Sequence, residues 1–165
     1  MTEKIVELLS NVPQEISVMI ISMLPVSELR GAIPAGILMY KINPVLVYLL
    51  AVVGNLIPVV FILLLLEKLD NFLRKRSRFF AGLFDKIYTR TRKRGEHKIK
   101  KAGSIALVTI VAIPLPMTGA WTGSLLAVLL KIPFKKAFPL IALGVVIAGI
   151  IVSMLTLMTD SFFRV

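Results

Sequence analysis

The sequence predicts an all-α integral membrane protein made of two inverted repeats, each a re-entrant helical hairpin followed by a transmembrane helix. Of its 165 residues, 57% are hydrophobic, a share typical of membrane proteins. Two stretches of 23 residues, 44–66 and 137–159, carry no charge, and each can cross a hydrocarbon core of about 30 Å. An apolar stretch interrupted by prolines and glycines precedes each of them. We treat residues 1–165 as one membrane domain, divided into repeat 1 (about 13–66), a basic linker (67–101) and repeat 2 (about 102–160).

Residues 16–40 form the first interrupted stretch, in which Glu28 and Arg30 are the only charged residues. Ionisable groups at bilayer depth are costly and normally face a protein interior or a wet cavity, together with a partner. Two prolines nine residues apart argue against one straight helix, because each removes a backbone donor and clashes with the preceding turn. We therefore expect a hairpin with Glu28 and Arg30 at its tip. The tip also holds four residues that break or loosen helices: Pro25, Gly31, Pro34 and Gly36.

The first uncharged span, residues 44–66, contains Asn55 beside Gly54, and Pro58 one turn later. A kink and a polar side chain in such a span are expected to face other parts of the protein rather than lipid. We expect Asn55 to hydrogen-bond the hairpin backbone, with contact to a substrate as the alternative.

The linker at 67–101 holds 13 of the 20 Lys and Arg residues but only 4 of the 9 acids, so it carries +9 of the net charge of +11. In a water-soluble protein this would indicate nucleic-acid binding. In a membrane protein it indicates a short cytoplasmic loop on anionic lipid, and we expect no nucleic-acid partner. Apolar residues recur at helical spacing from 69 to 87, which predicts a basic amphipathic helix in the interface. Its lipid-facing cations are Arg74, Lys75, Arg76 and Arg78.

Residues 104–130 form the second interrupted stretch, which has the same design without the charges. Its middle contains two prolines, two glycines and the single tryptophan: Pro114, Pro116, Gly119, Trp121 and Gly123. We expect Trp121 to pack at the hairpin tip, with a role as a gate as the alternative. The glycines of both tips are expected to allow close approach of backbones.

An internal repeat follows from this order of segments. At an offset of 90 residues, Lys41-Ile42 matches Lys131-Ile132 and Gly54 matches Gly144. With a shift of two, Gly31-Ala32 matches Gly119-Ala120. Repeats of this kind underlie many transporter folds.

Two membrane topologies are compatible with these segments, and they differ in the side of the membrane on which the lysines lie. If all four apolar stretches cross the membrane and the linker is cytoplasmic, the lysines at 131, 135 and 136 lie outside. If each interrupted stretch instead enters and leaves on one side, these lysines join the linker in the cytoplasm. We favour the second topology because it fits the positive-inside rule better and makes the two repeats inverted.

Several kinds of chemistry are not expected. The chain has no Cys and one His, His97 in the basic linker, so we expect neither disulfides nor a metal site. The apolar stretches hold no Ser/His or paired-Asp arrangement, and there is no nucleotide-binding loop. We therefore expect no enzyme, no cofactor and no ATP drive.

The segments SELRGAIPAG at 27–36, GN at 54–55 and IPLPMTGAWTG at 113–123 resemble the putative small multidrug export family of prokaryotic membrane proteins. The resemblance covers nearly the whole chain. It implies an inner-membrane protein with an export role. More distantly, the paired re-entrant loops with a buried acid and arginine resemble the DedA proteins, which are linked to moving lipid phosphates.

The candidate site lies at the two hairpin tips. Glu28, kept from water, is expected to carry a proton, and Arg30 to hold an anionic group by a bidentate contact. Ser27 and Thr118 are candidate N-caps of the inner half-helices, whose positive ends would point at the same centre. The alternative is that Glu28 and Arg30 form a structural ion pair that holds the hairpin together.

The leading functional hypothesis is a secondary, proton-coupled exporter of small amphipathic compounds with a midplane site. The first alternative is a DedA-like flippase or scramblase of lipids or lipid phosphates. The second is a scaffold that transports nothing and recruits anionic lipids or partner proteins through its basic helix. A homodimer is expected to be feasible, because four apolar segments enclose little volume.

Overall fold

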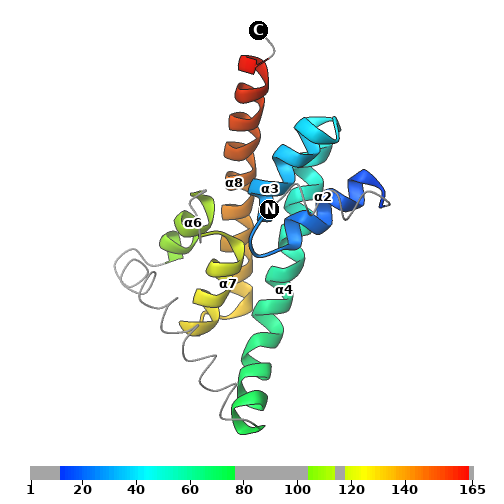
Figure 1. The fold of residues 1–165 in the computed structure, drawn as a ribbon. Helices are drawn as coiled ribbons and strands as arrows, with labels where there is room; N and C mark the ends of the chain where they lie inside the picture. The colour runs from blue at the N-terminus through cyan, green and yellow to red at the C-terminus, as the bar shows by residue number, and fades with distance from the viewer. Residues whose placement is uncertain (1–11, 77–103, 114–117, 164–165) are drawn as a thin grey trace.

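The structure, a computed structural model, describes residues 12–76, 104–113 and 118–163, and these residues are almost entirely helical (Figure 1). Two short helical hairpins flank a pair of long helices. The elements in chain order are α2 (Gln14–Met23), α3 (Glu28–Pro34), the π-helical turn η1 (Ala35–Met39), α4 (Pro44–Arg76), α6 (Ser104–Ala112), α7 (Ala120–Leu129) and α8 (Phe134–Phe163).

The first hairpin consists of α2, α3 and η1. The helix breaks between Met23 and Glu28, with Pro25 in the turn, so the prediction that residues 16–40 do not form one straight helix is correct. Pro34 was expected to break the chain as well, but it lies in the last turn of α3, and the helix continues into η1. A proline removes one helical hydrogen bond, and a wider π turn is a common way of accommodating such a loss.

The two long helices have the length and composition of membrane-spanning helices. Residues Pro44–Leu65 of α4 and Phe134–Ser161 of α8 are each long and apolar enough to cross a bilayer. Large apolar side chains point outward from both helices, for example Phe61 at 60% exposure and Met154 at 63%. Many exposed large apolar side chains on one helix are unfavourable in water and suit contact with lipid.

The start of the basic linker differs from the prediction. We expected the spanning helix to end near residue 66 and a separate amphipathic helix to begin near residue 69. Instead α4 runs without a break to Arg76, so residues 67–76 extend the spanning helix. Strong helix formers such as Glu, Lys and Leu follow residue 66 with neither proline nor glycine, so nothing in the sequence stops the helix there. The rest of the proposed amphipathic helix, with Arg78, lies outside the described residues, as does His97.

The element boundaries repeat at an offset of 90 residues. The first hairpin begins at Gln14 and ends at Met39, and the second begins at Ser104 and ends at Leu129. The long helices begin at residues 44 and 134. Lys41 and Lys131, which precede these helices, both adopt left-handed backbone conformations, with φ of 57° and 53°. The Lys41/Lys131 match in the sequence therefore marks the same turn in each half.

One of the sequence matches is not a structural equivalence. Gly31 lies inside α3, whereas Gly119 precedes α7 as its N-cap. The pairing of Gly31-Ala32 with Gly119-Ala120 is therefore wrong. The two hairpins share their outer boundaries, but four residues separate α2 from α3, whereas seven separate α6 from α7.

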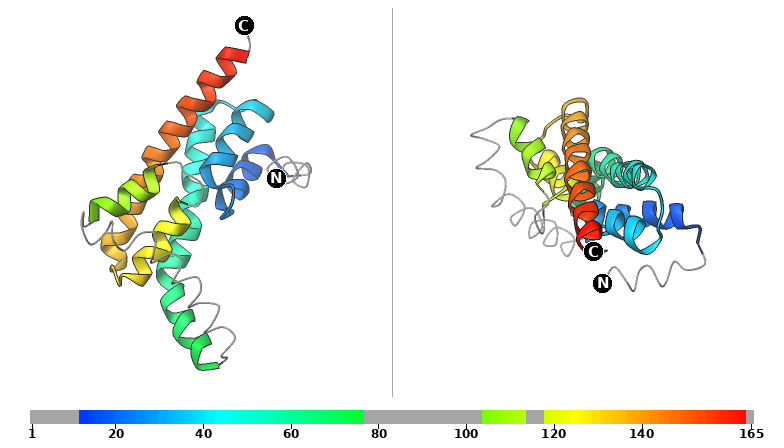
Figure 2. Two further views of the ribbon diagram at one scale, coloured as in Figure 1. Left: turned by 60° about the vertical axis from the view of Figure 1, so that its left-hand side comes forward. Right: turned by 90° about the horizontal axis from the view of Figure 1, so that it is seen from above.

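The two long helices run in opposite directions. In Figures 1 and 2, α4 descends from the end that follows η1, while α8 ascends beside it toward the C-terminus. The hairpin of α2 and α3 lies toward the upper end of this pair, and the hairpin of α6 and α7 toward the lower end (Figure 2). The buried apolar core runs between them, and α4 contributes Val47, Ala51 and Val59 to it while α8 contributes Ile141 and Val145.

Equivalent glycines let each hairpin pack closely on the long helix of its own half. A Cβ on Gly54 of α4 would lie 2.7 Å from the carbonyl oxygen of Met19 in α2. A Cβ on Gly144 of α8 would lie 2.6 Å from the Cβ of Val111 in α6. In the first half, the Ser22 hydroxyl also donates to the carbonyl of Ala51, 2.5 Å away, which links α2 to α4 by a polar contact.

We predict that Gly54→Ala and Gly144→Ala each destabilise the protein, although alanine favours a helix over glycine by about 1 kcal/mol. The added methyl meets atoms close to or in the backbone, and overpacking of this kind costs about 1–3 kcal/mol. Thermal unfolding in detergent, followed by the fluorescence of Trp121, measures the loss. Val53→Ile adds one carbon at an outward-facing neighbour of Gly54 and serves as the control. Equal unfolding midpoints for Gly54→Ala and Val53→Ile would contradict the close packing.

Candidate functional site

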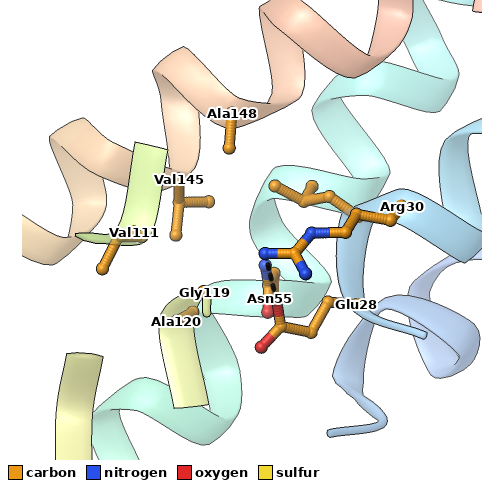
Figure 3. A pocket seen from close by; sticks show the side chains of 9 residues that line it. Glu28, Arg30, Asn55, Val111, Gly119, Ala120, Val145 and Ala148 are labelled. Carbon is orange, nitrogen blue, oxygen red and sulfur yellow. Dashed lines mark ion pairs between the residues drawn. The ribbon is translucent and has the colours of Figure 1, made fainter. Parts of the chain in front are cut away.

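The turns of the two hairpins meet at the centre of the molecule. Glu28 and Arg30, at the start of α3, face the residues that open α7, almost 90 positions later in the chain (Figure 3). The side chains that the sequence predicts at the two tips are therefore brought together.

Glu28 occupies the N-terminus of α7. One carboxylate oxygen, Oε1, accepts from the backbone N–H of Trp121 at 3.3 Å, and the N–H of Ala120 also donates to this carboxylate. The first N–H groups of a helix have no partner within it, and its N-terminus carries a partial positive charge. Because its carboxylate accepts from these N–H groups, Glu28 acts as a cap of α7 supplied by the other half of the protein. Its side chain is only 7% exposed.

The backbone at Glu28 is itself unusual. Its φ is 46°, in the left-handed region that a non-glycine residue adopts at some cost. This conformation ends the turn after α2 and begins α3 with the carboxylate directed toward α7. Such strain persists only where surrounding contacts favour it, and here the contacts are those to α7.

Gly119 makes room for the carboxylate. Its φ is 124°, which L side chains rarely adopt, and a Cβ at this position would collide with Oε2 of Glu28. Gly119 is also the N-cap of α7. Both its conformation and its lack of a side chain are therefore needed for Glu28 to reach the helix end.

Arg30 binds Thr118, the residue just before Gly119. Its Nη2 atom donates to the carbonyl oxygen of Thr118 at 2.8 Å and lies 3.3 Å from the Thr118 hydroxyl. The same nitrogen is 3.9 Å from Oε2 of Glu28, at the outer limit of an ion pair. Arg30 is 26% exposed, so it lies nearer the surface of the site than Glu28 does.

Two further hydrogen bonds complete the junction. The indole Nε1 of Trp121 donates to the carbonyl of Met23 at 3.2 Å, which ties α7 to the end of α2. The Thr118 hydroxyl donates to the carbonyl of Ile113 at 2.9 Å, within its own turn. We call the group formed by Glu28, Arg30, Thr118, Gly119 and Trp121 the inter-hairpin clasp.

A small cavity of about 10 Å³ lies beside the clasp (Figure 3). Its polar wall comes from Glu28, Arg30 and Asn55, and its apolar wall from α6 and α8 through Val111, Val145 and Ala148. Leu29, Gly119 and Ala120 complete the lining. Asn55 and Val145 are 90 residues apart, so the same position supplies an amide in one half and a hydrocarbon in the other.

Asn55 is 1% exposed, and its Oδ1 has no hydrogen-bond partner among the described residues. The prediction that it bonds the hairpin backbone is therefore wrong for this oxygen. Asn55 instead lines the cavity with an unpartnered acceptor. This position is compatible with the alternative that Asn55 contacts a substrate, which stays a prediction.

The predicted N-caps are also corrected. Ser27 does occupy the N-cap position of α3, as predicted, but its hydroxyl donates to the carbonyl of Ile21 at 2.7 Å and makes no hydrogen bond to an N–H group of the helix. Thr118 is not the N-cap of α7, because the helix begins one residue later, after Gly119. The left-handed Glu28 turns the start of α3 away from the geometry that a Ser cap needs, and the carboxylate of Glu28 replaces a Thr cap on α7.

The other tip residues have mixed positions. Gly36 and Gly123 lie where a Cβ would come within 2.6 Å of Val47 and 2.5 Å of Val111, respectively, so both allow close packing. Pro114 and Pro116 lie outside the described residues. Arg74, Lys75 and Arg76 end α4, with no side-chain positions described. The described ranges contain no group of three or more His, Cys, Asp or Glu residues that could hold a metal ion.

The sequence predicts which residues lie at the site, but it does not predict which groups they contact. Trp121 was expected to pack at the tip, and its hydrogen bond to Met23 was not foreseen. Gly119 was expected to allow close approach of backbones, whereas it accommodates the carboxylate of Glu28. One feature of the sequence could have indicated these contacts: the first tip carries Glu28 and Arg30, whereas the second tip carries no charge. Because a buried charged group needs a partner, the second tip was the place to look for groups that bind them.

Comparison with known families gives one finding. A family model described as "Putative small multi-drug export protein" matches residues 28–151, three quarters of the chain, and includes the clasp and the cavity. Comparisons with curated proteins and with solved structures give no significant match.

We predict that Gly119→Ala lowers the stability of the protein by about 2–3 kcal/mol, because the variant combines backbone strain with a displaced carboxylate. Thermal unfolding in detergent measures this loss. Ala120→Gly, at the adjacent first position of α7, is the matched control and should cost no more than about 1 kcal/mol. A Gly119→Ala protein as stable as the control would show that Glu28 does not require this geometry.

Proposed function

We propose that the protein, since its chain belongs to the putative small multi-drug export protein family, is a membrane exporter of small amphipathic compounds with its binding site at the inter-hairpin clasp. The observation that carries the proposal is the acid and base at the junction of two oppositely directed halves, with the groups that hold them in the other half. A site shared in this way can change when the halves move. The family description names an export role rather than catalysis, so we do not propose an enzyme.

The proposed topology is a pair of inverted repeats with re-entrant hairpins. The opposite directions of α4 and α8 and the common offset of 90 residues support it. Each hairpin arm is short: α2 has 10 residues and α7 has 10, which at 1.5 Å per residue is about half of a hydrocarbon core. We place the basic linker in the cytoplasm and the protein in the inner membrane of a prokaryote.

The walls of the cavity suit an amphipathic compound. One wall carries a carboxylate, a guanidinium and an amide, while the other carries only valine and alanine side chains. A cavity of about 10 Å³ has room for roughly one water molecule, so a substrate requires the hairpin turns to separate. We therefore interpret the present arrangement as a closed form.

Glu28 is the group through which protons would drive this movement. As a carboxylate it accepts from the N-terminus of α7 and attracts Arg30. Protonation removes its charge and weakens both contacts, since hydrogen bonds to an ionised acceptor are the stronger kind. Protonation would thus favour opening of the clasp, which couples proton binding to substrate access.

The lipid-phosphate alternative receives no specific support from the described residues. Transport of a lipid phosphate would need the N-terminus of α7 and the Arg30 guanidinium to be available for binding an anion. In the structure, Glu28 occupies that helix end, and Arg30 donates to the Thr118 carbonyl. The scaffold alternative depends on the linker, most of which lies outside the described residues.

The topology is tested by single cysteines at the equivalent positions Lys41 and Lys131, which are both exposed, in a chain without native Cys. We predict that a membrane-impermeant thiol reagent labels Lys41→Cys from the periplasm and Lys131→Cys from the cytoplasm. Four crossings would place both positions outside, because the basic linker fixes the cytoplasmic end of α4 in either case. Labelling of Lys131→Cys from the periplasm would therefore overturn the re-entrant arrangement.

The function is tested in proteoliposomes with an imposed pH gradient and ethidium as the amphipathic probe. We predict that Glu28→Gln reduces gradient-driven transport by about tenfold or more, because the variant cannot release a proton. Glu15→Gln removes an exposed carboxyl from α2 and should transport like the unmodified protein.

A wild-type rate in Glu28→Gln would remove the proton-coupling proposal. A parallel assay with a fluorescent phospholipid covers the alternative. Scrambling that is lost in Arg30→Ala, in vesicles that do not move ethidium, would favour lipid transport instead.

A further inference from the structure

We propose that Asn55 and Glu28 bind one buried water molecule in the cavity between the two halves, and that this water is the relay through which Glu28 exchanges its proton. The inference deepens the proposed function and rests on it for the role of the proton, but the water site itself can be tested without transport. Asn55 becomes a positioning residue for the chemistry of Glu28.

The side-chain amide of Asn55 has an oxygen without a hydrogen-bond partner among the described residues. Its Oδ1 is an acceptor in a residue that is 1% exposed, and none of the described residues donates to it. Leaving such a group without a partner costs about 1–3 kcal/mol, so buried acceptors nearly always have one. The apolar lining side chains Leu29, Val145 and Ala148 carry no polar hydrogen, and the described residues place no Arg30 N–H on this oxygen, so we infer that its partner is a guest molecule in the cavity.

The cavity has the size and the polar lining that one water molecule needs. A cavity of about 10 Å³ corresponds to roughly one water-sized probe, and a buried water needs two to four polar partners. Asn55, the Glu28 carboxylate and the Arg30 guanidinium all line this cavity and supply that number (Figure 3).

The same lining disfavours a metal ion. Hard cations take oxygen ligands, several of them at once. Here the side-chain oxygens are those of Asn55 and Glu28, while the opposite wall is valine and alanine. The guanidinium of Arg30, 3.9 Å from Oε2 of Glu28, also repels a cation from this space.

Water fits both protonation states of Glu28. When the acid is ionised, the water donates one hydrogen to Asn55 and the other to the carboxylate. When the acid is protonated, the carboxyl donates to the water and the water still donates to Asn55. The amide oxygen therefore has a partner throughout, and the water keeps its place during proton exchange.

The relay is needed because Glu28 has little direct access to solvent. The side chain is 7% exposed, and its other contacts are backbone N–H groups and Arg30, which do not release protons readily. On protonation, one O–H bond of the water breaks as its hydrogen moves to the carboxylate, and the hydroxide left behind takes up a proton from solvent at the Arg30 edge of the cavity, where that side chain is 26% exposed. Release reverses both steps. Among the described residues that line the cavity, Glu28 and Arg30 are the only charged ones.

The test is infrared spectroscopy of the full chain in lipid nanodiscs, at a pH low enough to protonate Glu28. The carboxyl C=O band of Glu28 is assigned by its disappearance in Glu28→Gln, and hydrogen–deuterium exchange of this carboxyl is followed after transfer to D₂O. We expect Asn55→Leu, which removes the acceptor, to shift the band and slow the exchange by about tenfold, as the loss of one hydrogen bond in the relay would.

A second variant acts on the space rather than on the amide. Ala148→Val adds two carbons on the apolar wall without touching a polar group, and it should slow the exchange in the same way. Ser153→Ala is the matched control, because it removes another buried and unpartnered polar atom from α8 that does not line the cavity. Its exchange rate should equal that of the unmodified chain, and thermal unfolding verifies that all variants are folded.

Unchanged band position and exchange rate in folded Asn55→Leu or Ala148→Val would overturn the proposal. A band that shifts when Na⁺ replaces K⁺ would overturn it as well, by identifying a metal ion instead of water. Slow exchange in both cavity variants, with transport of ethidium absent in every variant including the unmodified chain, would support the water site while refuting the exporter.

Discussion

A helix that stops inside an apolar environment leaves backbone N–H and C=O groups that water cannot satisfy, and this constraint governs the whole structure. Each hairpin has such a break near the centre. The carboxylate of Glu28 accepts hydrogen bonds from the N–H groups at the start of α7. Arg30 donates to the carbonyl of Thr118, and the indole of Trp121 donates to the carbonyl of Met23. The breaks are therefore satisfied across the interface between halves, and neither half is complete alone.

The repeat in the backbone is not matched by a repeat in the chemistry. The helix boundaries and the left-handed lysines recur at one offset, yet the charged residues of the site belong to the first half. The second half supplies backbone donors, a glycine without a side chain, and hydrocarbon. This division is physically reasonable, because two buried acids facing each other would repel, whereas one acid can be held by a helix end.

Much of the architecture can be predicted from the sequence, because its signals are local. Pro25 lies in the turn where the first helix breaks, the uncharged spans have the length of a bilayer, and Lys41 and Lys131 mark the same turn in both halves. The details of the site could not be predicted in the same way. Local capping rules assign Ser27 and Thr118 to the helix ends beside them, but the actual cap of α7 comes from Glu28, in the other half. Likewise, the sequence shows Asn55 as polar, but only the packing of α6 and α8 decides that its oxygen faces a cavity.

The glycine contacts at Gly54 and Gly144 have a consequence for how such a molecule could move. Gly54 packs directly on the backbone of α2, and Gly144 packs on Val111 of α6. Surfaces packed this closely cannot slide without collision, so α2 with α4, and α6 with α8, would each move as a rigid body. Between these two bodies, α4 and α8 meet through softer contacts, such as the ring of Tyr48 against Gly149 and its 3.4 Å hydroxyl contact with the Val146 carbonyl. Any movement between the two bodies would then have to occur along the surfaces where they meet, which include the clasp as well as the contact of α4 with α8.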